Sequence, residues 1–218
     1  MKHLASRGII LQKKDSFEQD RIIVALTERY GKLRLLAKGV KKITSRRLSK
    51  LELFNLCFFQ IYNVRADKKL ITQCEVEETF VNIKKDLRII TAASYIAEIT
   101  DKFILENQPA DKIFLLLKKS LETLNGGKNS LIIVTSYSIK LLTILGYLSD
   151  FRKTLNENQK KLAPLQTLPM EILASKKIPE KIQQELLRKS QKLLSEHIAI
   201  ETIRSAKFLM PIPICKLE

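Results

Sequence analysis

The chain has 218 residues, of which 45% are hydrophobic and only six are glycine and six proline. These proportions are typical of a globular protein with an aliphatic core, and they exclude a disordered chain. Lysine and arginine number 39 against 23 aspartates and glutamates, and a formal net charge of +16 indicates a polyanionic partner such as nucleic acid.

The first 80 residues have the pattern of short β-strands. Runs rich in β-branched and aromatic residues alternate with turn-forming pairs such as Tyr30-Gly31 and Lys38-Gly39. The expected strands cover residues 8–11, 22–26, 33–37, 51–62 and 70–80. Five short strands in this length suit a small antiparallel barrel, which leaves no strand edge open.

After residue 80 the apolar residues recur at steps of three and four, the spacing of a helix face. The expected helices cover residues 89–103, 113–124, 131–145, 179–197 and 200–209, with a polar, irregular segment at 149–169. The most apolar stretch, 131–148, contains Lys140 and several hydroxyls, which favours a buried helix over a membrane span. The fold class is therefore α+β, with a barrel domain over 1–80 and a helical domain over 81–218.

The positive charge is concentrated in one segment. Nine basic residues and no acidic residue lie between Arg29 and Leu51, whereas charges of both signs mix in residues 176–201. A general bias toward lysine is the alternative explanation, but such a bias would not clear one window of acids. Alternation along a strand and a following basic loop would present a row of phosphate contacts. The expected contact residues are Lys32, Arg34, Lys38, Lys41, Lys42, Arg46 and Arg47.

Four aromatic residues of the same region could stack on bases, as small barrels that bind single strands often do. They are Tyr30, Phe58, Phe59 and Tyr62. For each of them, packing in the core is the favoured interpretation. Without a motif for reading base edges, binding is expected to depend on phosphates and shape and to show little sequence preference.

No group of residues predicts catalysis or a metal site. His3 is expected in a frayed terminus, and His197 late in a helix has a structural role. The three cysteines, Cys57, Cys74 and Cys215, are widely spaced and are expected to be buried and reduced. There is no P-loop motif and no zinc-ligand spacing. The sequence therefore predicts a protein that is not an enzyme and uses no cofactor or metal.

Three carboxylates stand close together at Asp15, Glu18 and Asp20. They could bind a cation, but carboxylates in such a turn more often accept hydrogen bonds from backbone amides and pair with a nearby cation. The favoured interpretation is a loop organised by these acids, with Arg21 as their partner.

Several segments resemble, in order and spacing, the RecO family of bacterial recombination mediators. The match extends over residues 4–147 and 186–209. The segments are Arg7-Gly8-Ile9-Ile10-Leu11, Phe17-Glu18-Gln19-Asp20-Arg21-Ile22, Tyr30-Gly31-Lys32-Leu33, Ala37-Lys38-Gly39-Val40-Lys41-Lys42, Ser45-Arg46-Arg47-Leu48, Asp86-Leu87-Arg88, Leu145-Gly146-Tyr147 and Ser205-Ala206-Lys207-Phe208-Leu209.

The resemblance implies an N-terminal OB-fold barrel and a helical C-terminal domain. It also implies binding of single- and double-stranded DNA, annealing of complementary strands, and loading of RecA together with RecR onto gaps coated by single-stranded-DNA-binding protein. The expected setting is the bacterial cytoplasm, without a membrane. The family's basic segment falls on five of the residues named above: Lys38, Lys41, Lys42, Arg46 and Arg47.

Two further expectations follow from the resemblance. Many relatives have a four-cysteine zinc site after the position of Leu145-Gly146-Tyr147, but residues 148–169 contain no cysteine, so this chain resembles the metal-free members. The acidic tail of single-stranded-DNA-binding protein is expected to dock on the helical domain. The candidate residues there are Lys112, Lys118, Lys119 and Lys140 beside Phe114, Leu117 and Leu141.

Two other hypotheses stay open on the residues alone. An OB-like barrel with this charge would equally suit an RNA-binding protein of translation or ribosome assembly. A protein-binding scaffold whose charge reflects only composition is the other.

Overall fold

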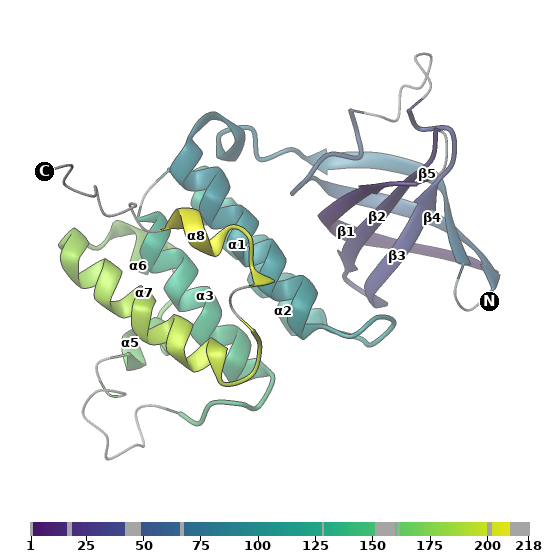
Figure 1. Ribbon diagram of the computed structural model, residues 1–218. Coiled ribbons are helices and arrows are strands. Elements are labelled where there is room, and N and C mark those ends of the chain that lie inside the picture. Colours follow the sequence, from purple (N-terminus) through teal and green to yellow (C-terminus); the bar gives the residue numbers. More distant parts are fainter. Residues whose placement is uncertain are drawn as a thin grey trace, which may run out of the picture. The chain divides into compact units, whose positions relative to one another are not determined.

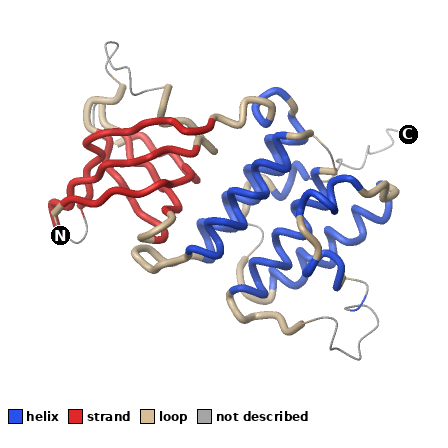
Figure 2. Tube along the Cα trace, turned by 180° about the vertical axis from the view of Figure 1, so that it is seen from behind, coloured by secondary structure: helices blue, strands red, loops and turns tan. Residues whose placement is uncertain are grey.

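The computed structural model describes residues 2–16, 19–41, 49–65, 68–127, 129–150, 160, 162–199 and 202–209. Strands occupy the N-terminal part and helices the remainder, which confirms the α+β class (Figure 2). The chain divides into two compact units, one of residues 1–80 and 100–118 and the other of residues 81–99 and 119–218. Among the described residues, no helix has both the length and the apolar character needed to cross a membrane.

Five strands close into a barrel in the order β1-β2-β3-β5-β4 (Figure 1). β4 pairs antiparallel with β1, and the β4–β5 hairpin then brings β5 beside β3 in the parallel sense. One parallel pair thus closes an otherwise antiparallel barrel, and the expected OB-like fold is confirmed. The strands are β1 (His3–Asp15), β2 (Arg21–Thr27), β3 (Gly31–Ala37), β4 (Leu56–Arg65) and β5 (Lys68–Glu78).

The interior of the barrel is filled by alternate residues of its strands, because successive side chains of a strand point to opposite faces. Phe59 belongs to this core and is completely shielded from solvent. Cys57 and Cys74 are both buried, as expected for these two cysteines. A hydrogen bond between the two thiols, together with burial, raises the pKa of Cys57. The other main members of this core are Ile10, Ile23, Ala25, Leu33, Leu35, Ile61 and Ile71.

The helical part is built around α3, which is buried on nearly every side and packs against α5, α6 and α7. This arrangement confirms the expected buried helix and explains its continuous apolar sequence. The helices are α1 (Leu87–Phe103), α2 (Asp111–Asn125), α3 (Ser130–Ile144), α5 (Ala163–Thr167), α6 (Met170–Ser175), α7 (Glu180–Ser195) and α8 (Ala206–Leu209), with a 3-10 turn η1 at Ile83–Lys85.

Some elements differ from the sequence-based expectations. β1 begins at His3 rather than at residue 8, because it pairs with β4 from His3 opposite Tyr62 onward, so the expected frayed terminus was wrong. The strand expected over 51–62 begins only at Leu56, since Phe54 adopts a positive φ of 68°. The short helix α5 lies inside the segment 149–169, which was expected to be irregular, and a second short helix, α6, follows this segment directly.

Candidate nucleic-acid interface

Lys32 and Arg34 both point outward from β3, because their neighbours Leu33 and Leu35 fill the barrel. Lys32 is nevertheless covered and only 9% exposed. Its Nζ lies 3.0 Å from Asp101 Oδ1 and also donates to the main-chain carbonyl of Asp101. Lys32 therefore joins β3 to the end of α1 within the first unit. Its ammonium is covered and does not form part of the exposed surface.

Arg34 remains accessible, with half of its side chain exposed. Its Nε and Nη2 both lie 3.1 Å from Oε1 of Glu106, so a single carboxylate oxygen contacts both nitrogens on one edge of the guanidinium. Lys38 follows the end of β3 and is exposed. The remaining expected residues Lys42, Arg46 and Arg47 lie outside the described residues.

The β4–β5 hairpin adds two cations, Arg65 and Lys68, that lie outside the basic segment between Arg29 and Leu51. The parallel pairing sets Leu35 beside Lys69, and Arg34 and Lys68 are the residues that directly precede this pair on β3 and β5. Arg65 pairs with Lys68 across the hairpin, and both are exposed. The pairing of β3 with β5 joins residues more than thirty positions apart, so no local pattern could have placed these cations on the same side of the barrel as Arg34. We call Arg34, Lys38, Arg65 and Lys68 the cationic face.

A row of partly buried apolar residues crosses the same outer side of the barrel. Leu36 of β3 pairs with Leu70 of β5, and Leu70 pairs with Tyr62 of β4. All three are partly exposed, and the Tyr62 ring lies 5.0 Å from that of His3. Tyr62 is thus the expected stacking residue that shares an outer side with the cationic face.

The other aromatic candidates have different surroundings. Phe59 is fully buried, so for this residue packing in the core is confirmed. Tyr30 packs against the barrel core and is partly buried, and Phe58 is also partly buried.

The turn between β1 and β2 is held by Asp15. Its carboxylate lies 3.2 Å from Arg21 Nε and 3.4 Å from Lys41 Nζ. The hydrogen bond from Arg21, followed by that from Lys41, lowers the pKa of Asp15. Lys41 is thereby held against the turn, with about a quarter of its side chain exposed.

Asp20 fixes the segment after β3 to the same turn. Its Oδ1 accepts a hydrogen bond of 2.7 Å from the amide of Gly39, and the amide of Lys41 donates to the carbonyl of Gln19 at 3.0 Å. The loop-organising role is confirmed for Asp15 and Asp20, whereas Glu18 lies outside the described residues. These contacts hold the segment 38–41 against Gln19 and Asp20.

Two adjoining family models match the chain. The model described as "Recombination protein O N terminal" matches residues 1–80, and "Recombination protein O C terminal" matches residues 84–165. The chain belongs to the RecO family.

Curated RecO relatives are similar over the same region. "DNA repair protein RecO" of Thermoanaerobacter sp. (strain X514) is 35% identical over 149 residues, covering 68% of this chain and 60% of the relative. The protein of the same name from Acetivibrio thermocellus is 34% identical, covering 67% and 59%, and that from Caldanaerobacter subterraneus is 32% identical, covering 68% and 60%. The match thus spans less than two thirds of the length of these RecO relatives.

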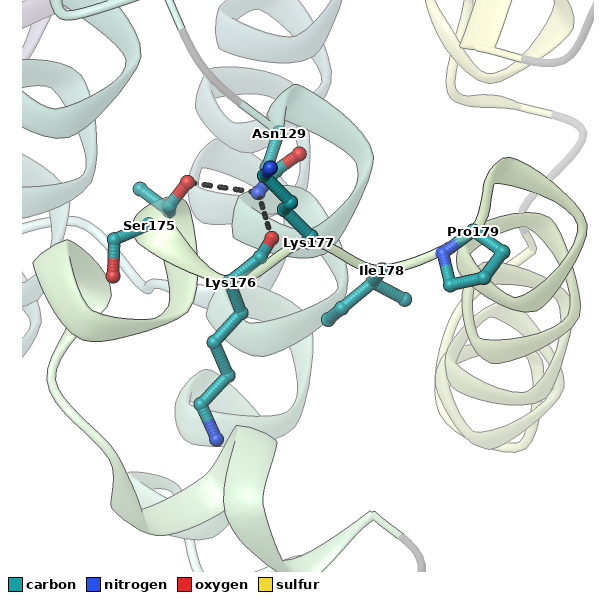
Figure 3. Close-up of a pocket in the computed structure, with 7 residues that line it drawn as sticks. Asn129, Ser175, Lys176, Lys177, Ile178 and Pro179 are labelled. Atoms are coloured by element: carbon teal, nitrogen blue, oxygen red, sulfur yellow. Dashed lines mark hydrogen bonds between the residues drawn. The ribbon is translucent and has the colours of Figure 1, made fainter.

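A hollow of about 660 Å³ lies in the second unit, between the start of α3 and the connection from α6 to α7 (Figure 3). The side-chain amide of Asn129 donates to the carbonyls of Ala174 at 2.8 Å and Lys176 at 2.6 Å. The described residues that line the hollow are aliphatic, hydroxyl, amide and lysine groups, without a carboxylate, histidine or cysteine. Asn129 thus acts as a structural tie between two segments of the RecO helical part.

The apolar residues expected to hold an acidic tail are closed off from solvent. Phe114, Leu117 and Leu141 are each at most 1% exposed. Lys140 donates to the carbonyl of Leu168 at 2.6 Å, and burial lowers its pKa. The expectation that these apolar side chains would line an open docking pocket was wrong, because all three are buried. Within the described part of the chain, no three histidine, cysteine or acidic side chains lie close enough to hold a metal ion.

Proposed function

We propose that this RecO-family protein binds DNA through the cationic face and anneals complementary strands during recombinational repair. The observation that supports the proposal most is that three neighbouring strands carry the exposed cations Arg34, Arg65 and Lys68, and one of these strands also carries the partly exposed Tyr62. Cations that follow the phosphates, next to an aromatic ring, suit a single strand with little sequence preference.

Five cations of the proposed interface lie among the residues that the structure describes. Arg34 and Lys38 are exposed, Lys41 is partly exposed, and Arg65 and Lys68 extend the surface across the hairpin. Lys42, Arg46 and Arg47 would continue it, as the family's basic segment suggests. Lys32 is left out because its ammonium is engaged by Asp101.

Annealing is the step that the charge supports. A protein with a formal charge of +16 lowers the repulsion between two phosphate backbones and so speeds their encounter. Such a step needs no nucleotide hydrolysis, and the sequence has no P-loop. Family membership supports the wider role, in which the protein acts with RecR to load RecA onto gaps coated by single-stranded-DNA-binding protein, in the bacterial cytoplasm.

We further assign DNA binding to the barrel over residues 1–80 and partner binding to residues 81–218. The first compact unit also includes residues 100–118, so the barrel should be tested within the full chain rather than as a fragment.

The test compares the affinity of the full chain for single-stranded DNA, double-stranded DNA and RNA of the same sequence, together with its annealing rate. We expect DNA binding that weakens with salt, and annealing that neither ATP nor EDTA changes. A clear preference for RNA would favour the translation or ribosome-assembly hypothesis. No binding to any nucleic acid at low salt would favour the protein-binding scaffold.

A further inference from the structure

The connection between α1 and α2 lies against the start of β3, inside the first compact unit. Glu106 forms an isolated parallel bridge with Lys32, and the amide of Asn107 donates to the carbonyl of Lys32 at 2.9 Å. At Gly31, an added Cβ would lie 1.7 Å from the carbonyl oxygen of Gln108. Main-chain contacts therefore hold this connection on β3, and the Glu106 side chain is carried there with it.

Two ion pairs join the same segments but differ in their access to water. In the pair between Lys32 and Asp101, the side chains are 11% and 27% exposed. In the pair between Arg34 and Glu106, they are 50% and 40% exposed. Because solvent screens an exposed pair, it contributes little to stability, and either partner can exchange for another ion. The first pair is therefore the fixed one and the second the exchangeable one.

We propose that Glu106 is a built-in competitor of DNA for Arg34. The inference rests on the proposed function, in which Arg34 contacts phosphate. The side of the guanidinium that now faces a Glu106 oxygen presents the N–H groups that would bind a phosphate oxygen. A bound phosphate displaces the carboxylate, which stays nearby because its backbone is held on β3, and repels the phosphate as a like charge. Glu106 therefore weakens the hold on a strand and favours its release.

Glu77 offers a control substitution that removes one negative charge outside the cationic face. Glu77 binds Arg7 Nε through both oxygens, at 2.8 and 3.0 Å, and the two side chains are 34% and 52% exposed. The pair between Arg7 and Glu77 thus resembles the pair between Arg34 and Glu106 in chemistry and exposure. Any general effect of a lost negative charge on DNA affinity should appear equally in Glu77→Gln.

The experiment measures the dissociation constant of a single-stranded oligonucleotide over a range of salt concentrations. It compares the full chain with its Glu106→Gln, Glu77→Gln, Arg34→Gln and Arg34→Gln/Glu106→Gln variants, and includes Glu106→Ala as a second form. We expect Glu106→Gln to bind about two- to fivefold more tightly at low salt, the range set by an exposed ion pair. The gain should exceed that of Glu77→Gln, fade at high salt, and disappear when Arg34 is replaced.

Two results would overturn the proposal while leaving DNA binding in place. One is equal gains for Glu106→Gln and Glu77→Gln, and the other is an undiminished gain in the absence of Arg34. If the unaltered chain binds no nucleic acid at low salt, the proposed function itself fails, and this inference fails with it.

Discussion

Lys32 Nζ lies 3.0 Å from Asp101 Oδ1, although the two residues are separated by 69 positions and come from a strand and a helix. The Lys32 ammonium also donates to the carbonyl of Asp101, so two acceptors satisfy a cation that is largely removed from water. A cation so placed stabilises the fold only while its partners remain, since a buried charge without a partner is costly.

We therefore predict opposite consequences for two neighbouring cations of β3. Lys32→Ala should lower the free energy of unfolding by about 1–3 kcal/mol, because it leaves Asp101 without its ammonium partner. It should leave the salt dependence of DNA binding unchanged. Arg34→Gln should change stability by less than about 1 kcal/mol but reduce that salt dependence. Urea denaturation and DNA titrations of both variants check this, and a stable Lys32→Ala protein with weakened DNA contacts would contradict it.

The cationic face gives a second prediction. Replacing Lys38, Arg65 and Lys68 by alanine removes three phosphate contacts, each of which contributes about 0.7 to the log–log salt slope on single strands. The slope should therefore fall by about 2, with little loss of stability because the three side chains are exposed. Titration of a single-stranded oligonucleotide at several salt concentrations measures the slope.

A matched control for this variant is available on α7 and the segment before it. Lys177, Lys181 and Arg188 are equally exposed, and their replacement by alanine removes the same three charges. If the slope falls as much in this control as in the triple variant of the barrel, the effect comes from net charge and not from a local interface.

The sequence predicted the barrel well where its signals are local. The expected strands at 22–26 and 33–37 lie inside β2 and β3, because short apolar runs with β-branched residues between turn-forming pairs are enough to indicate a strand. The expected strand at 51–62 started too early. Leu51 and Phe54 are buried although they lie in a bend and a turn rather than in a strand. Hydrophobicity alone does not distinguish a buried turn from a strand.

The candidate site was harder to predict from the sequence than the barrel. Lys32 and Arg34 point to the same side of β3. Lys32 is covered because Asp101 of α1 and the connection after α1 pack on it, whereas Arg34 stays open. Arg65 and Lys68 were missed because they join Arg34 through the pairing of β3 with β5. Both facts depend on contacts between distant parts of the chain.

A third prediction concerns pH. The hydrogen bonds from Arg21 and Lys41 lower the pKa of Asp15 in the folded protein. A depressed folded pKa stabilises the protein above the unfolded pKa of about 4, and this stabilisation is lost as the pH falls through the folded value. Asp15→Asn should therefore lower the melting temperature at neutral pH, and the difference from the unaltered protein should shrink below pH about 4. Thermal melts between neutral and acidic pH test this, and a difference that stays constant over the range would show that the charge of Asp15 is not its cause.

The last prediction compares two glycines with positive φ. Gly31 has a φ of +65°, and an added Cβ would lie 1.7 Å from the carbonyl oxygen of Gln108, whereas Gly146 has a φ of +83° and open space around its Cβ position. Alanine at either position bears the conformational cost of about 1–2 kcal/mol. Only at Gly31 must a backbone segment also move, so Gly31→Ala should lower the free energy of unfolding by at least about 2 kcal/mol more than Gly146→Ala. Because the displaced segment contains Glu106, Gly31→Ala should also weaken the contact between Glu106 and Arg34. Chemical denaturation of both full-length variants gives the comparison, and equal losses of stability would mean that the connection between α1 and α2 does not press on β3 at Gly31.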